Sequence, residues 1–361
     1  MEAAMRHGSE KTARLGSLCL GGGHPVMVQS MTNTDTRDVK ATLAQIGRLC
    51  ERGCEAVRVA VPDDRAAACL KALRQASPVP LIADIHFDWR LALAAVDAGF
   101  EGLRINPGNI GSKERVDAVV DACKASGCAM RIGVNSGSVE RELLDKYGGP
   151  TPDAMVESCL RHVAMVEARG FDNIVLSVKS SSVLDTVACY RRLAKASPYP
   201  LHLGVTEAGS PLRGAVKSAA GLGILLAEGI GDTIRVSLTA DPCEEMDVCW
   251  ELLRCLGLRR FGPEIVSCPT CGRTEIDLIG LEQAVERRLR GVRAPIKVAV
   301  MGCVVNGPGE SREADLGVAG GKDKGVIFRK GKVVRSVAGQ EHLLPAFMEE
   351  LQKLLDEEGN R

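Results

Sequence analysis

The chain has 361 residues with 46 basic and 46 acidic side chains, so its formal net charge is zero, and only 3% of its residues are aromatic. This length predicts about two domains, whereas the balanced charge and the scarce aromatic side chains argue against nucleic-acid and membrane-surface binding. The sequence has no recognisable signal peptide and no apolar run of about 18 residues, so we expect a cytoplasmic protein that does not span a membrane.

Residues 1–24 are polar and glycine-rich, and we expect a hairpin or a cap here, ahead of the first core strand. From Pro25 onward, a short apolar run, a polar tip and a longer amphipathic stretch repeat eight times. The predicted strands are Val26–Met31, Ala56–Val61, Pro80–His86, Gly102–Asn106, Ala129–Val134, Asn173–Lys179, Leu201–Glu207 and Thr233–Leu238. Strands that alternate with helices pair in parallel, which predicts an α/β fold with a (β/α)8 barrel, also called a TIM barrel, over residues 1–258. A doubly wound open sheet is the alternative, but eight regular units favour the barrel.

Basic side chains interrupt these apolar strands. Arg58, Arg104, Arg131 and Arg235 each lie between two apolar residues of a strand, and Lys179 ends a fifth strand. A single arginine at such a position more often forms a structural ion pair. Four arginines in one barrel must converge toward its axis or its mouth, and their mutual repulsion and desolvation are costly unless an anion lies among them. Guanidinium groups suit phosphate oxygens, and barrel enzymes place their sites at the carboxyl ends of the strands. We therefore predict a small, doubly phosphorylated ligand at that end.

Further polar residues follow the same strands. We expect hydrogen bonds to phosphate or hydroxyl groups from Asn106, Asn135 and Ser237, and proton-transfer groups at Asp84, His86 and Glu207. Each of them, taken singly, is as well explained as a loop cap. Glu207 stands out because Thr-Glu-Ala-Gly at a strand end leaves a carboxyl group at the barrel mouth.

The stretch Gly257–Pro263 ends the barrel periodicity, and we predict a second, small α/β domain over residues 264–361. Its pattern predicts a helix near 278–289, strands at 296–300 and 326–337 with a turn at Lys330-Gly331, and a final helix over about 341–355.

This second domain contains a metal-binding pattern. Cys268-Pro-Thr-Cys271 and Met301-Gly-Cys303 supply three soft ligands, and no cysteine follows Cys303. Three thiolates suit a [4Fe-4S] cluster with a weaker fourth position, for which Glu310 is the nearest candidate. A structural zinc site is the alternative, although His342 is the only histidine after Cys271 and lies far from the glycine-rich turn. The other 11 of the 14 cysteines are best explained as reduced, buried thiols.

Six motifs, in order through both domains, resemble one family, the 4-hydroxy-3-methylbut-2-enyl diphosphate synthases of the non-mevalonate isoprenoid pathway. They are Val28–Asn33, Leu103–Ile110, Arg131–Gly137, Gly204–Gly209, Cys268–Gly272 and Met301–Glu310. The resemblance implies an oxidoreductase whose barrel binds 2-C-methyl-D-erythritol 2,4-cyclodiphosphate. A [4Fe-4S] cluster would deliver two electrons for reductive ring opening and dehydration to (E)-4-hydroxy-3-methylbut-2-enyl diphosphate.

The resemblance also implies residue roles and partners. The cluster ligands fall on Cys268, Cys271, Cys303 and Glu310, and the diphosphate-binding positions on Arg58, Arg104, Arg131, Asn135, Lys179, Arg235 and Ser237. Glu207 matches a glutamate near the reacting hydroxyl group, where it is expected to donate a proton. An electron donor such as flavodoxin or ferredoxin is implied, and the absence of a domain inserted between the two parts implies the short bacterial form, a head-to-tail homodimer.

Two rival functions remain open on the residues alone. One is a non-redox phosphate-binding barrel, such as a pterin-linked transferase or an aldolase, with a zinc-stapled tail. The other is a zinc-ribbon-like nucleic-acid-binding module after the barrel, which the three phenylalanines of that part, Phe261, Phe328 and Phe347, are too few to support. The C-x3-C-x2-C spacing of radical enzymes that use S-adenosylmethionine is absent.

Overall fold

A computed structural model describes residues 8–303, 312–321 and 323–359. The chain divides into two compact units, Met1–Arg259 and Arg260–Arg361. None of the helices in the described ranges is both long enough and apolar enough to cross a membrane.

The first unit is a ring of eight parallel strands. They are β3 (Met27–Met31), β4 (Ala56–Ala60), β5 (Leu81–Asp84), β6 (Gly102–Ile105), β7 (Ala129–Asn135), β8 (Ile174–Lys179), β9 (His202–Leu203) and β10 (Thr233–Ile234). The strand order is β8-β7-β6-β5-β4-β3-β10-β9, and a parallel bridge between Leu176 and Leu201 joins the two ends. The predicted (β/α)8 barrel is thus confirmed. The last two strands are shorter than predicted, so Glu207, Arg235 and Ser237 lie on the loops that continue from them.

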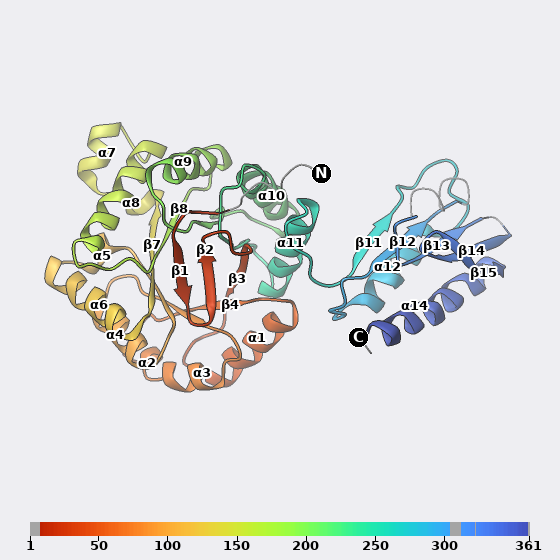
Figure 1. The fold of residues 1–361 in the computed structure, drawn as a ribbon, viewed down its shortest axis with the longest axis horizontal. Helices are drawn as coiled ribbons and strands as arrows, with labels where there is room; N and C mark the ends of the chain where they lie inside the picture. The colour runs from red at the N-terminus through yellow and green to blue at the C-terminus, as the bar shows by residue number, and fades with distance from the viewer. Residues whose placement is uncertain (1–7, 304–311, 322, 360–361) are drawn as a thin grey trace. The chain divides into compact units, whose positions relative to one another are not determined.

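Helices surround this ring (Figure 1). They are α1 (Val39–Glu51), α2 (Asp64–Ala67), α3 (Leu70–Ala76), α4 (Trp89–Asp97), α5 (Pro107–Ile110), α6 (Lys113–Ser126), α7 (Arg141–Tyr147), α8 (Pro152–Glu167), α9 (Val183–Ala196), α10 (Pro211–Ala227) and α11 (Pro242–Cys255). Residues next to the helix starts cap their free backbone amides. Asp38 accepts a hydrogen bond from the amide of Ala41 at the start of α1 (2.9 Å), and α8 begins with Thr151 as its cap and Pro152 in its first turn. The buried face of α1 includes Ile46 and Leu49, which are three residues apart and so lie on one side of the helix.

A hairpin precedes the barrel, as expected from the sequence. Strands β1 (Thr12–Leu15) and β2 (Leu18–Gly21) pair antiparallel. Their buried Ala13, Leu15 and Leu20 form one apolar cluster with residues at the amino ends of the barrel strands, namely Met27, Ala56, Ile82, Ala129 and Val175. The hairpin therefore closes the amino-terminal end of the barrel and leaves the carboxyl-terminal end for a site.

In its described residues, the second unit has a five-stranded sheet and the helices α12 (Leu278–Leu289) and α14 (Leu343–Gly359). The strand order is β11 (Glu264–Ser267), β12 (Lys297–Met301), β13 (Leu316–Gly320), β14 (Lys324–Arg329) and β15 (Lys332–Ala338), with the first three strands parallel and the others antiparallel. Both helices contribute to one apolar core with the sheet, for example Val285, Val298 and Phe347. The predicted strands and helices of this part are present, whereas β11 and β13 were not predicted: β11 is short and half-exposed, and β13 contains two glycines.

Candidate active site

Three predicted site residues lie side by side on neighbouring barrel strands. In register, Asp84 on β5 pairs with Arg104 on β6, which pairs with Arg131 on β7. Residues at one level of adjacent strands face the same side of a sheet, and those two positions apart on a strand share a face. Since Ile82 and Ala129, two positions earlier, face the hairpin inside the barrel, the three polar side chains also point inward, one layer higher.

A cavity of about 140 Å³ opens at this level. Its lining residues are Arg58, Asp84, His86, Arg104, Arg131, Asn135, Ser177, Lys179, Thr206, Arg235 and Ser237. The structure thus gathers nine of the eleven barrel residues predicted for the site, Asp84 and His86 included, around one cavity. Ser177 and Thr206 were missed. Ser177 was accessible to reasoning, because it precedes Lys179 by two positions on β8 and shares its face.

Asp84 is the central anion of the cavity. Its carboxylate lies 3.8 Å from Arg58 Nε, 3.4 Å from Arg104 Nη1 and 3.5 Å from His86 Nε2. Burial alone would raise the pKa of Asp84, but Arg58, the hydrogen bond from His86 and Arg104 together hold it well below its usual range. Burial lowers the pKa of Arg58 to about 9, which Asp84 only partly offsets.

Two residues outside the cavity lining contact its arginines. Arg131 Nη1 donates to Gln29 Oε1 on β3 (3.4 Å). Glu245 on α11 lies with its Oε2 3.8 Å from Arg235 Nε and accepts hydrogen bonds from Ser30 Oγ (3.0 Å) and the amide of Leu238 (3.1 Å). Sequence reasoning missed both. Gln29 could have been found by strand alternation, whereas Glu245 reaches the site from a helix about 200 residues away along the chain from Ser30.

Two glycines make room for the cations. A Cβ at Gly133 of β7 would lie 2.7 Å from Arg104 Nε, and one at Gly204 would lie 2.7 Å from Lys179 Nζ. A Cβ at either position would push the basic group away, so these glycines permit the close approach of Arg104 and Lys179 to the backbone.

Two predicted residues do not line the cavity. Asn106 is buried and caps α5, where its Oδ1 accepts from the amide of Gly108 (3.0 Å). Glu207 is exposed on the loop after β9, next to the cavity residue Thr206, and has a positive φ of 54°. Such a conformation is uncommon for a residue other than glycine and is concentrated at functional sites.

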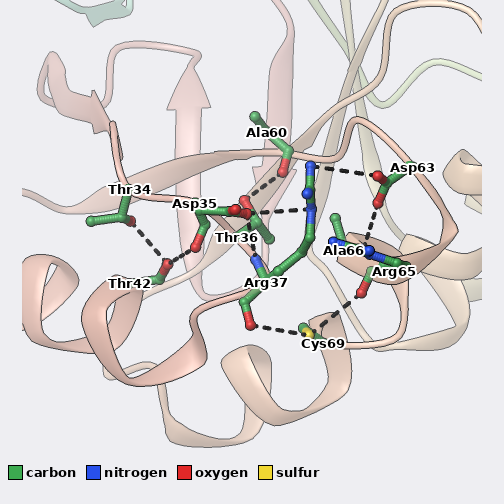
Figure 2. A network of polar contacts seen from close by, with 10 residues as sticks. All are labelled: Thr34, Asp35, Thr36, Arg37, Thr42, Ala60, Asp63, Arg65, Ala66 and Cys69. Atoms are coloured by element: carbon green, nitrogen blue, oxygen red, sulfur yellow. Dashed lines mark hydrogen bonds and ion pairs between the residues drawn. The ribbon is translucent and has the colours of Figure 1, made fainter.

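Polar contacts join the loops that follow β3 and β4 (Figure 2). In the loop after β3, Thr36 is buried and its hydroxyl donates to the carbonyl oxygen of Ala60 at the end of β4 (2.6 Å). Arg37 Nη2 of the same loop lies 3.5 Å from Asp63 Oδ2 in the loop after β4. These contacts fix the carboxyl ends of two neighbouring strands relative to each other.

The second unit brings the predicted cysteines to one edge of its sheet. Cys268 follows β11 directly, and Cys303 follows the adjacent parallel strand β12. Cys268 Sγ accepts a hydrogen bond from the amide of Gly302 (3.2 Å), and hydrogen bonds from Arg273 lower the pKa of the exposed Cys271 thiol. Within the described ranges, no three Cys, His, Asp or Glu side chains are close enough to form a metal-binding group. Glu310, the predicted fourth ligand, lies in 304–311, outside the described residues.

A closed barrel with a basic, inward-facing cavity at its carboxyl end defines a phosphate-binding barrel enzyme, here followed by a cysteine-bearing α/β unit. The chain belongs to the GcpE family: the GcpE TIM-barrel domain matches residues 10–250, and the GcpE protein C-terminal domain matches residues 264–353.

Two related proteins are similar in sequence over nearly the whole length of this chain. The 4-hydroxy-3-methylbut-2-en-1-yl diphosphate synthase (flavodoxin) of Lawsonia intracellularis is 64% identical over 343 residues, which cover 95% of this chain and 96% of that protein. The protein of the same name from Nitratidesulfovibrio vulgaris is 61% identical over 345 residues, covering 96% and 89%. Among solved structures, the dihydropteroate synthase of Yersinia pestis covers 69% of this chain and 98% of its own, with 16% identity and a TM-score of 0.47, too low to bear on function.

Proposed function

We propose that this protein is an oxidoreductase that converts 2-C-methyl-D-erythritol 2,4-cyclodiphosphate into (E)-4-hydroxy-3-methylbut-2-enyl diphosphate by reductive ring opening and dehydration, a step of isoprenoid precursor biosynthesis. The observation that carries the proposal is the cavity, in which four arginines and one lysine converge. The GcpE family membership and relatives named for this synthase support the same reaction.

The cationic side chains bind and orient the diphosphate. Arg58, Arg104, Arg131, Lys179 and Arg235 neutralise its charge, and Asn135 and Ser237 donate hydrogen bonds to its oxygens. Asp84 keeps Arg58 and Arg104 in place through its two ion pairs, and His86 Nδ1 lies 3.4 Å from Arg104 Nη1. Asn106 supports the site indirectly, by fixing the start of α5.

Glu207 is the proposed proton donor. Ring opening of the cyclic diphosphate with loss of water consumes two electrons and one proton when the product leaves as a trianion. The departing hydroxyl group needs that proton, and an exposed carboxyl group on the loop next to Thr206 is able to exchange it with solvent.

The electrons require a redox group, and we assign a [4Fe-4S] cluster to Cys268, Cys271 and Cys303, with Glu310 as the exchangeable fourth ligand. When bound, this cluster supplies two electrons and a Lewis-acidic iron. The donor set fits: three thiols of one unit lie in a short turn and at two adjacent strand ends, and a backbone amide already hydrogen bonds Cys268 Sγ. Zinc is the less suitable occupant, because structural zinc sites are closed by four Cys or His ligands.

The relatives' names carry the word flavodoxin, which supports reduced flavodoxin as the electron donor. We further propose that the protein works in the cytoplasm as a head-to-tail homodimer in which the cluster unit of one subunit serves the barrel of the other.

One experiment tests the reaction and the cofactor together. The protein is purified without air, its iron, acid-labile sulfide and visible absorption are measured, and it is then incubated with the cyclic diphosphate and reduced flavodoxin. We expect about four irons and four sulfides per chain and a new open diphosphate detected by phosphorus NMR. A Cys268→Ser variant, as a control, should lose cluster and turnover together. A colourless protein that holds one zinc and forms no product would contradict the proposal and favour a non-redox barrel enzyme.

A further inference from the structure

Lys179 differs from the other four cations of the cavity because it has no protein partner. Each arginine contacts a polar group: Arg58 and Arg104 the carboxylate of Asp84, Arg131 the amide oxygen of Gln29, and Arg235 the carboxylate of Glu245. No hydrogen bond or ion pair joins Lys179 Nζ to any residue in the described part of the chain.

The lysine is also enclosed. It is 9% exposed, and its Nζ packs so closely against the Gly204 backbone that a Cβ there would lie 2.7 Å away. The charged and titratable groups around it come from every neighbouring part of the barrel: Arg58 (β4), Asp84 (β5), His86 (after β5), Arg104 (β6), Arg131 (β7), His202 (β9), Arg235 (after β10) and Glu245 (α11). Strand β3 contributes uncharged side chains at this level: Gln29, Ser30 and Met31, whose Sδ accepts a hydrogen bond from Arg58 Nε (3.0 Å).

Fully ionised, the five cations and the two carboxylates, Asp84 and Glu245, would leave three unbalanced positive charges in a small cavity. The arginines relieve this repulsion less readily. Burial lowers the pKa of Arg58 to about 9, which still leaves it charged near pH 7, and also lowers the pKa of Arg131, but a guanidinium group starts from an intrinsic value above about 12. The amine of Lys179 loses its proton first, because its intrinsic pKa is only about 10.4. Burial, followed by the charges of Arg131 and Arg58, indeed lowers the pKa of Lys179 well below its usual value.

We propose that Lys179 is a neutral amine in the free enzyme and takes up one proton from solvent when a diphosphate enters the cavity. The inference rests on the proposed function, which supplies the diphosphate. The proton adds to the nitrogen lone pair and no other bond changes. Phosphate oxygens provide the negative partner that the protein lacks at this position, so the ammonium form becomes stable only in the complex.

This proton uptake has a consequence for catalysis. Four arginines and two carboxylates leave two positive charges, which match the two negative charges of the cyclic diphosphate. Ring opening frees a terminal phosphate oxygen and adds a third negative charge. The protonated Lys179 supplies the matching positive charge before the bond breaks, as electrostatic preorganisation requires.

Calorimetry measures the proton directly. The oxidised holoenzyme is titrated with 2-C-methyl-D-erythritol 2,4-cyclodiphosphate without a reductant, at pH 7.5, in buffers that differ in ionisation enthalpy. Each phosphorus of this ligand carries a single, strongly acidic group, so the ligand itself exchanges no proton near this pH. The slope of the observed enthalpy against the buffer enthalpy gives the number of protons taken up. We expect about one, and a Kd that rises by up to tenfold per pH unit in the alkaline range.

Two variants identify the group. Lys179→Arg carries a permanent charge and should bind the ligand with a slope near zero, whereas His86→Gln, a control at the other titratable cavity side chain, should keep a slope of about one. Iron content and near-ultraviolet circular dichroism check that each variant is folded. Wild-type binding with no proton uptake, or uptake that persists in Lys179→Arg, would overturn the assignment to Lys179 while leaving the diphosphate site intact. If the wild type does not bind the cyclic diphosphate at all, the proposed function fails as well.

Discussion

A single added methyl group at Gly133 tests whether the position of Arg104 matters. In Gly133→Ala the new Cβ would lie 2.7 Å from Arg104 Nε and 3.3 Å from its Nη2, whereas ordinary contact begins near 3.4 Å. The guanidinium group must therefore move by at least about 0.7 Å, judged against ordinary contact distances. A displacement approaching 1 Å at a binding group costs up to about 100-fold in rate. We expect kcat/KM with reduced flavodoxin to fall about 10- to 100-fold, and the Kd of the substrate to rise.

The fold should survive this substitution, because Gly133 is not among the glycines with positive φ and alanine is compatible with a strand. Gly47→Ala is the matched control: it adds the same methyl group on α1, where nothing lies within 4 Å, and should leave kcat/KM unchanged while stabilising the helix by up to about 1 kcal/mol. If Gly133→Ala keeps wild-type kcat/KM and substrate affinity, Arg104 does not act from the position described here.

Substitutions at three further positions probe the support of the cavity. Glu245→Ala removes the acceptors of Ser30 and Leu238 next to Arg235 and should raise KM more than it lowers kcat. Glu245→Gln keeps one amide oxygen for the N–H of Leu238, and its NH2 group can donate to Ser30 Oγ, so it should recover much of the loss. Equal kinetics of the two variants would contradict this positioning role. The pKa of Asp84 lies below its unfolded value of about 3.9, so its contribution to stability is present above that pH and is lost as the pH falls through the lowered value. Asp84→Asn should lower the free energy of unfolding at pH 7 by about 3 kcal/mol or more. Urea unfolding between pH 2 and pH 7 should also show that the variant loses less stability on acidification than the wild type does. An equal loss of stability in both proteins would refute the ion-pair argument. Leu15→Ala, in the apolar cluster between the hairpin and the barrel strands, should lower the free energy of unfolding by about 2–5 kcal/mol. The KM of the remaining folded enzyme should stay normal, and a changed KM would show that the hairpin also shapes the cavity.

The sequence was sufficient for the barrel because both periodicities were regular. Apolar runs of about five residues alternated with amphipathic stretches, and six of the eight strands lie close to their predicted bounds. The last two strands are shorter than predicted because β9 and β10 end after two paired residues, although Val205 and Val236 beyond them are still buried. Extended, buried backbone has the composition of a strand whether or not it is paired, so pattern reasoning cannot separate the two.

The cations of the site were predictable for a different reason. An arginine inside an apolar strand violates the pattern that folding requires, and such violations concentrate at functional sites. The residues that position these cations are normal for their local structure, so the sequence does not single them out. Glu245 is an ordinary acidic residue near the start of a helix, and Gly204 is one of 39 glycines. Only the closed barrel brings Glu245 to Arg235 and the backbone of Gly204 to Lys179.

The apolar cluster under the hairpin and the basic cavity both follow from the alternation of side chains along the barrel strands. The residues that pack on the hairpin include Met27, Ala56, Ile82, Ala129 and Val175, and the residues two positions further along the same strands are Gln29, Arg58, Asp84, Arg131 and Ser177. A shift of one residue in the register of any of these strands would turn its apolar residue away from the hairpin and remove its polar group from the site at the same time. The hydrophobic contacts at the amino end therefore fix the register that points the cations into the cavity at the carboxyl end, so stability and ligand binding in this barrel depend on the register of the same strands.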